Sequence, residues 1–203
     1  MGLFRRLFGP SRKEIWTQLS AEIGARYKEG GFWKGDKVEA THGDWTVTLD
    51  TYSVSTGKVT IVYTRMRAPY VNPGGLRFKI YRAGIFSGVG KMLGMQDIEI
   101  NVDPFDRDFI IKGTDEEKVR ELFSNPRLRE LVALQKDVNL EVKDDEGWFG
   151  PSFPEGVDEL SFVVGGVITD IERLKLLYEL FAETLEQLCR MGVAYEQAPD
   201  VVL

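Results

Sequence analysis

Residues 97–134 constrain the fold more than any other stretch, because strand and helix signals follow one another there without a gap. Apolar residues alternate with polar ones over 97–102, and a second apolar run covers 109–112, so two strands are predicted. The acidic residues 103–108 between them lack the central glycine and distal glutamate of a calcium-binding EF-hand loop. They predict a solvated turn and no metal site.

Two short helices are predicted directly after the second strand. Thr114 and Glu117 have the spacing of a capping box, which marks a helix start. Asn125 is a favoured N-cap, and Pro126 suits the first helical position because its missing N–H has no partner there. Residues 97–134 therefore predict a junction between a sheet-rich half and a helical half.

Alternation of apolar and polar residues predicts the rest of the sheet. It covers 45–49, 59–63 and 76–80, joined by short turns, and we expect these strands to form an antiparallel meander. Another pair of strands is predicted at 138–142 and 160–164, as a hairpin with a long turn.

Helices are predicted at both ends of the chain. Ser11 and Glu14 have capping-box spacing, and an apolar face runs from Ile15 to Tyr27. Asp170 caps a last helix of about 22 residues with one apolar stripe. The fold class is therefore α+β: a largely antiparallel sheet of about six to eight strands, covered by an N-terminal helix, a central helix pair and a long C-terminal helix. Residues 10–203 are predicted to form a single domain, after an N-terminal arm over 1–9.

Composition excludes several kinds of site. The chain has one cysteine, Cys189, and one histidine, His42, which excludes an internal disulfide and a multi-histidine metal centre. No cofactor is predicted. No apolar run approaches the roughly 20 residues that span a bilayer, and the N-terminus lacks the apolar core of a secretory signal. These features predict a cytoplasmic protein.

The chain has a net charge of −6, which is divided unevenly between its two halves. Residues 1–91 hold 15 Lys/Arg and 7 Asp/Glu, whereas residues 92–203 hold 11 and 25. Either the two halves attract one another within the fold, or a bipolar surface steers an anionic partner to the N-terminal half. The basic residues are scattered along strands rather than clustered, so nucleic-acid binding is not expected.

Two groups of residues are candidates for binding a ligand or partner. Arg65 and Arg67 end one predicted strand and could hold a carboxylate or phosphate, unless they pair with acidic residues across the sheet. Trp148, Phe149 and Phe153 lie in the long turn and either cover an edge of the core or form a lip on a binding site.

Two further groups could contact a partner. Leu176 and Leu180 fall opposite the main stripe of the last helix, where either the C-terminal tail covers them or they mark a homodimer contact. In the arm, four apolar residues flank Arg5 and Arg6, which suits a short amphipathic contact with an anionic membrane surface. These four are Leu3, Phe4, Leu7 and Phe8. The alternative is an arm that docks on the core or frays.

Several stretches resemble a family of small bacterial proteins of unknown function. They include GFWKGDKVEATHGDWTVTLDTY, YTRMRAP, FDRDFIIKG, FSNPRLREL, EVKDDEGWFG and FPEGVDELSF, and the likeness covers most of the chain beyond the arm. The resemblance implies a bacterial, cytosolic setting and assigns no catalytic residue.

The function predicted from the sequence is a non-catalytic binding or protein-interaction module. Its partner would be a protein or a small anionic or apolar ligand. A small ligand could lie between the sheet and the last helix. Catalysis by carboxylates alone is the enzymatic alternative, and it requires two buried carboxylates with raised pKa in one cleft. Membrane association through residues 1–9 is the third reading.

Overall fold

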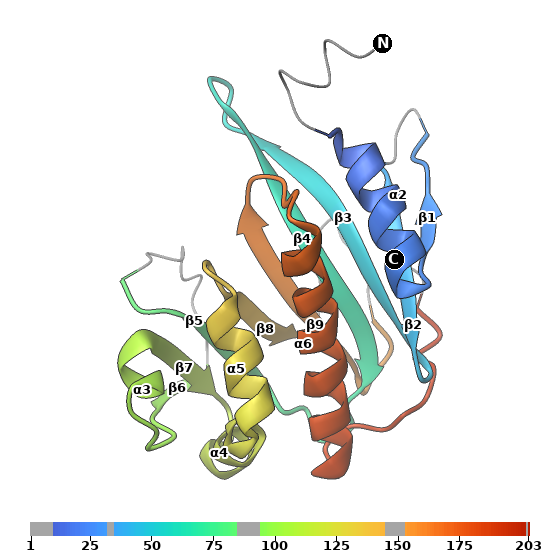
Figure 1. Cartoon of the computed structure of the whole chain (residues 1–203). Coiled ribbons are helices and arrows are strands. Elements are labelled where there is room, and N and C mark those ends of the chain that lie inside the picture. Colours follow the sequence, from blue (N-terminus) through green and yellow to red (C-terminus); the bar gives the residue numbers. More distant parts are fainter. Residues whose placement is uncertain (1–9, 32–34, 85–93, 145–152, 202) are drawn as a thin grey trace.

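A nine-stranded antiparallel sheet is the centre of the computed structural model, which describes residues 10–31, 35–84, 94–144, 153–201 and 203 (Figure 1). Its strands are β1 (Arg26–Lys28), β2 (Lys37–His42), β3 (Trp45–Ser55), β4 (Thr60–Val71), β5 (Phe78–Arg82), β6 (Gln96–Ile98), β7 (Phe109–Gly113), β8 (Asn139–Lys143) and β9 (Val157–Gly165). Their order across the sheet is β1-β2-β3-β4-β9-β8-β5-β7-β6. The α+β class is confirmed, with one strand more than the highest number predicted.

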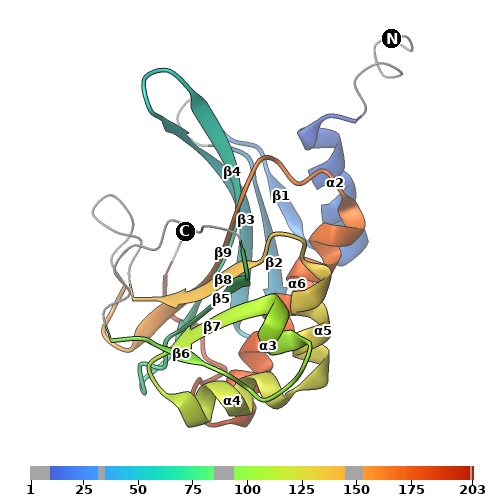
Figure 2. The same ribbon diagram turned by 90° about the vertical axis from the view of Figure 1, so that its left-hand side faces the viewer.

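The helices cover one face of this sheet, as Figure 2 shows. They are α2 (Arg12–Ile23), α3 (Phe105–Asp108), α4 (Glu116–Ser124), α5 (Pro126–Leu134) and α6 (Ile171–Arg190). The longest, α6, contacts α2, α4 and α5. The predicted N-terminal helix, central pair and long last helix are therefore all confirmed. Within the described residues, no helix is both long enough and apolar enough to cross a membrane.

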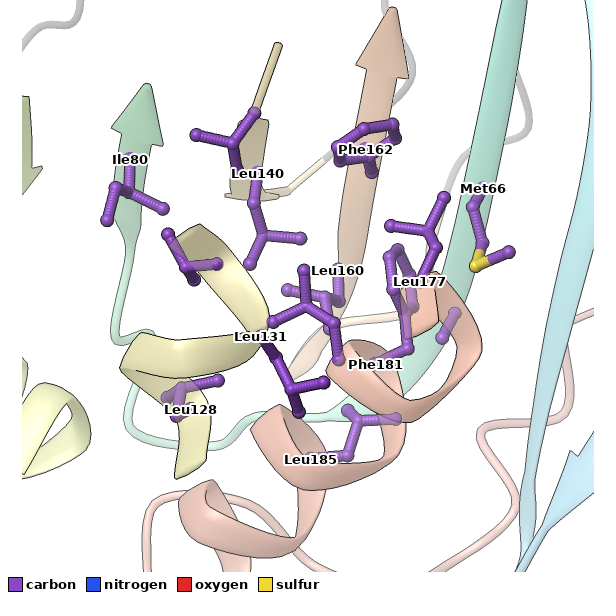
Figure 3. Close-up of a cluster of buried hydrophobic side chains, with 14 of the residues drawn as sticks. Met66, Ile80, Leu128, Leu131, Leu140, Leu160, Phe162, Leu177, Phe181 and Leu185 are labelled. Atoms are coloured by element: carbon purple, nitrogen blue, oxygen red, sulfur yellow. The ribbon is translucent and has the colours of Figure 1, made fainter. Parts of the chain in front are cut away.

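The core fills the space between the sheet and α5 and α6 (Figure 3). Phe181 and Leu177 of α6 meet Leu160 and Phe162 of β9, and all four side chains have no exposed surface. Because side chains alternate along a strand, these β9 residues share the helix-covered face with Met66 on β4, which pairs with Phe162. This packing buries apolar surface in the place where a small ligand was expected.

Three local predictions were wrong. The first helix ends at Ile23 and does not continue through Tyr27 to Gly30-Gly31, where its end was expected, because Gly24 adopts a left-handed conformation (φ 67°) and its N–H donates to the Ser20 carbonyl. Asp115, not Thr114, caps α4 by accepting a hydrogen bond from the Lys118 N–H at 3.1 Å.

The third error concerns the meander. Strands β2, β3 and β4 follow one another in the sheet, but β9 and β8 lie between β4 and β5. The hairpin predicted at 138–142 and 160–164 is therefore inserted into the middle of the sheet, where Leu140 pairs with Phe162.

Candidate functional site

The sheet face that turns away from the helices carries a row of polar residues across all nine strands. Successive members are cross-strand neighbours, in the order Arg26, Glu39, Thr48, Arg67, Ser161, Glu141, Lys79, Lys112 and Asp97. Several of them are nevertheless buried, with exposed fractions of 4% for Arg67 and 1% for Ser161. Charged groups that are buried in this way need partners, because desolvation of a lone charge is costly.

Arg65 and Arg67 meet at one carboxylate on this open face. Asp50 of β3 accepts hydrogen bonds from Arg65 Nε at 2.9 Å, Arg65 Nη2 at 2.8 Å and Arg67 Nη2 at 2.6 Å. The Arg65 guanidinium also lies over the ring of Tyr52, 5.1 Å from its centroid. The structure therefore brings the two predicted arginines together, but in cross-strand pairs with an acidic residue, which is the alternative to an anion site.

Two other clusters repeat this arrangement of one carboxylate between two cations. Glu39 lies between Lys28 (2.6 Å) and Lys37 (2.8 Å), and Glu141 lies between Lys79 (3.1 Å) and Lys143 (3.3 Å). Burial acts to raise the pKa of Glu39, but hydrogen bonds from Lys28 and Lys37 outweigh it and the net pKa is lowered.

A small cavity of about 190 Å³ lies on the same face, beneath the C-terminal segment. Its lining comprises Lys28, Glu39, Thr46, Thr48, Pro69, Val201 and Leu203. The Lys37 ammonium holds the segment there by donating to the Leu203 carbonyl at 2.8 Å, and Figure 2 shows the C-terminus on the side opposite the helices. Drug-sized ligands occupy pockets of roughly 300–1,000 Å³, so this cavity is small for one.

Two buried acids that are neighbours in sequence do not form the carboxylate pair that carboxylate catalysis requires. Asp158 and Glu159 are both buried and adjacent in β9, but side chains alternate, so they lie on opposite faces of the sheet. Burial raises the pKa of Asp158, which accepts a hydrogen bond from Asn72 Nδ2 at 2.6 Å under the helices. These two acids therefore share no cleft. In the described part of the chain, no three His, Cys, Asp or Glu side chains are grouped as metal ligands would be.

The remaining predicted site residues lie apart from the open-face clusters. Trp148 and Phe149 fall outside the described residues, and Phe153 is half-buried just before β9. Leu180 has no exposed surface, and Leu176 is half-buried and packs against the core. Leu180 is thus a core residue within this fold rather than an exposed contact. The arm residues Leu3, Phe4, Leu7 and Phe8 also fall outside the described residues.

The sequence prediction missed a surface on the distal half of the β3–β4 hairpin, residues 52–63, here called the ribbon. β3 pairs with β4 as far as Ser55 and Thr60, whereas β2 follows β3 only to Leu49 and β9 follows β4 only to Thr64. The ribbon therefore extends past its neighbouring strands, and both views show it projecting from the molecule (Figures 1 and 2).

One face of the ribbon is apolar and exposed. The exposed fractions are 43% for Val54, 58% for Val59 and 42% for Ile61, and Val54 lies directly opposite Ile61. Tyr52 and Tyr63, the next pair toward the sheet, stack with ring centroids 5.2 Å apart. The alternation of residues in the sequence places these side chains on one face of a strand. Nothing in the local sequence shows whether the rest of the protein buries that face or leaves it exposed.

Comparison with known proteins adds little to this geometry. No family model matches the chain, and no curated protein matches it. Among solved structures, the crystal structure of the mycobacterial trehalose monomycolate transport factor A, TtfA, is similar at 9% sequence identity. The match covers 87% of this chain and 97% of that one with a TM-score of 0.47, which is too low to support an argument about function.

Proposed function

We propose that this chain is a non-catalytic binding module whose contact surface is the ribbon. The observation that carries the proposal is the exposure of Val54, Val59 and Ile61 together on one face of a projecting hairpin. Single exposed apolar residues are ordinary, but a contiguous exposed group is typical of an interaction site. The bacterial and cytoplasmic setting predicted from the sequence is part of this proposal.

The ribbon is built to present this face in a fixed orientation. An isolated two-stranded hairpin is marginally stable, so the ribbon depends on its base for order. There the Tyr52–Tyr63 stack is continued by the Arg65 guanidinium over Tyr52, and Arg65 is bonded in turn to Asp50. A preorganised apolar surface loses less entropy when it binds than a flexible one does.

The open face of the sheet supports a non-catalytic reading. Its carboxylates Asp50, Glu39 and Glu141 each lie between two cations, and these ion pairs give the charged groups of the face their partners. A general acid or base works best with a pKa near the operating pH, whereas hydrogen bonds from Lys28 and Lys37 lower the pKa of Glu39. The clusters instead stabilise the polar face of the sheet.

Site-specific photo-crosslinking in bacterial cells tests the proposal. A photoreactive residue replaces Ile61 in one full-length variant and Thr60 in another, since Thr60 is exposed on the opposite face of the same ribbon. We expect an adduct from position 61 and little from position 60, with both variants as thermally stable as the parent. Equal yields from the two positions, or none from either, would overturn the ribbon as the contact surface.

A further inference from the structure

The outer edge of β3 in the ribbon is a second surface, distinct from the apolar face. The Thr56 N–H donates to the Val59 carbonyl at 3.0 Å, so the main-chain groups of Thr56 point toward β4. Bonding directions alternate along an antiparallel strand, so the main-chain groups of Ser53 and Ser55 point away from β4. Among the described strands, none pairs with β3 beyond Leu49, where its pairing with β2 ends.

This open edge is short. Gly35 lies against the Thr51 carbonyl, so the open stretch begins after Thr51. On the other side of the ribbon, the Gly166 N–H donates to the Val62 carbonyl at 2.7 Å, so the edge of β4 is partly occupied. The β3 edge therefore offers a further strand two N–H groups and two carbonyls, one of each from the two serines named above.

The ribbon edge also lacks the protection that the ends of the sheet have. The outermost strands, β1 and β6, are three residues long and carry the charged side chains Arg26, Lys28 and Asp97. Short, charged edge strands oppose pairing with another chain. Residues 51–57 contain no charged side chain, and Val54 in their middle is 43% exposed. An uncharged open edge of this kind favours the addition of a strand.

We infer that two copies of the chain pair edge to edge through their ribbons, about a two-fold axis at Val54. In this antiparallel arrangement Ser53 of each copy bonds to Ser55 of the other, which satisfies all the outward groups of both edges. The two Val54 side chains meet at the axis as cross-strand neighbours. A two-stranded hairpin is only marginally stable, whereas the paired ribbons form a sheet of four strands.

Charge and shape are compatible with a second copy. The whole chain carries a net charge of −6, so two copies repel wherever their bodies meet. Antiparallel pairing puts the two bodies at opposite ends of the joined ribbons, which project from the molecule in both views (Figures 1 and 2). Residues 52–63 contain one charged residue, Lys58, in the turn. The two Lys58 side chains therefore lie at opposite ends of the paired stretch.

Pairing enlarges the apolar surface of the ribbon. Val54 lies opposite Ile61 within each copy, so the joined sheet presents both residues of both copies on one face. The second copy thus contributes half of this surface. The role of the enlarged surface rests on the proposed function, whereas the pairing itself rests on the open backbone edge.

Sedimentation velocity of the full chain tests the pairing. Because so small an interface is typical of weak association, we expect a monomer at about 10 µM and a dimer at about 0.5 mM. The dimer should persist at about 1 M salt, where charges are screened within about 3 Å, since hydrogen bonds and apolar contacts hold it.

Ser53→Pro removes the N–H that faces the second copy, and proline is tolerated on a strand edge when that side faces solvent. It should raise the dissociation constant of the dimer about tenfold or more, because each copy loses a hydrogen bond. Ser53→Ala keeps the N–H and is the matched control, with an unchanged dissociation constant. Circular dichroism should show the same thermal midpoint for both variants.

Cross-linking through introduced cysteines gives a readout that does not depend on proline. Val54→Cys places two thiols at the axis, where cross-strand Cβ atoms lie about 4.5–5.5 Å apart, and we expect a disulfide-linked dimer on mild oxidation. Ile61→Cys lies on the same face, but three strand spacings, about 14 Å, separate the two copies of this position, so it should link far less. The parent, with Cys189 as its single cysteine, gives the background.

Three results would overturn the inference: a monomer at every concentration, a dimer that Ser53→Pro leaves intact, or equal linking from positions 54 and 61. Failure here is distinguishable from failure of the proposed function. An adduct with another protein from position 61, in a chain that stays monomeric, would keep the ribbon as a contact surface and exclude the pairing. A dimer that links at position 54, without such an adduct, would keep the pairing and exclude another protein as the ribbon's partner.

Discussion

Leu176 and Leu180 of α6 form a matched pair that tests where the core ends. They lie one helical turn apart, but Leu180 has no exposed surface whereas Leu176 is half-buried. Replacing Leu180 with alanine removes three buried carbon atoms, which at about 0.8 kcal/mol each is about 2.4 kcal/mol of transfer free energy. The cavity that remains adds a further cost, so we expect a total loss of about 3–4 kcal/mol. The same change at Leu176 should cost about 1 kcal/mol, because part of its surface is already in water.

Urea unfolding followed by circular dichroism measures both losses. With a slope of about 2 kcal/mol per molar, Leu180→Ala should lower the midpoint by about 1.5–2 M and Leu176→Ala by about 0.5 M. Neither shift should depend on protein concentration, since the residues pack within one chain. Similar shifts for the two variants, or midpoints that rise with protein concentration, would refute the assignment of Leu180 to the core and restore the dimer contact.

Two further predictions concern acidic residues of the sheet. Burial raises the pKa of Asp158 above its ordinary 3.8, so ionisation costs the folded state stability as pH rises from that value through the folded-state pKa. Asp158→Asn keeps an acceptor for Asn72, and its free energy of unfolding relative to the parent should be higher at pH 7 than at pH 3, as urea titrations at both pH values would check. Asp50→Ala should cost about 3 kcal/mol, because it leaves the buried Arg67 without this carboxylate. Asp97→Ala should cost less than about 1 kcal/mol, because that side chain is 74% exposed, and equal losses would contradict the burial argument.

Local signals predicted the helices because their causes are local. A capping interaction joins residues three positions apart, so Ser11 with Glu14, Asn125 with Leu128 and Asp170 with Arg173 can be recognised without knowledge of the fold. The wrong N-cap assignment to Thr114 is an error of one residue. Asp115 is the next residue and an equally good cap, and it is the one whose carboxylate reaches the Lys118 N–H.

Strand order could not be predicted in the same way. Alternation assigns each residue to a face, but it does not identify the neighbouring strand. β5 lies beside β8 because Ile80 pairs with Leu140 and packs against the helices, a contact between residues 60 positions apart. The same limit applies to Arg65 and Arg67. The register of β4 with β3 places Asp50 beside them, whereas their residue types alone were equally compatible with binding an external anion.

The ribbon was missed because its exposure depends on where other strands end. Continuing β3 outward on the open face, Asp50 is followed by Tyr52 and Val54, and on β4 Arg65 is followed by Tyr63 and Ile61. The face thus changes from charged to apolar at the level where β2 and β9 stop pairing with these strands. A strand face that only met water would have no physical reason to become apolar there, since exposed apolar surface gains nothing until it is buried. The change therefore indicates that the ribbon and the sheet meet different surroundings, which is the strongest reason to expect the ribbon's partner to be apolar.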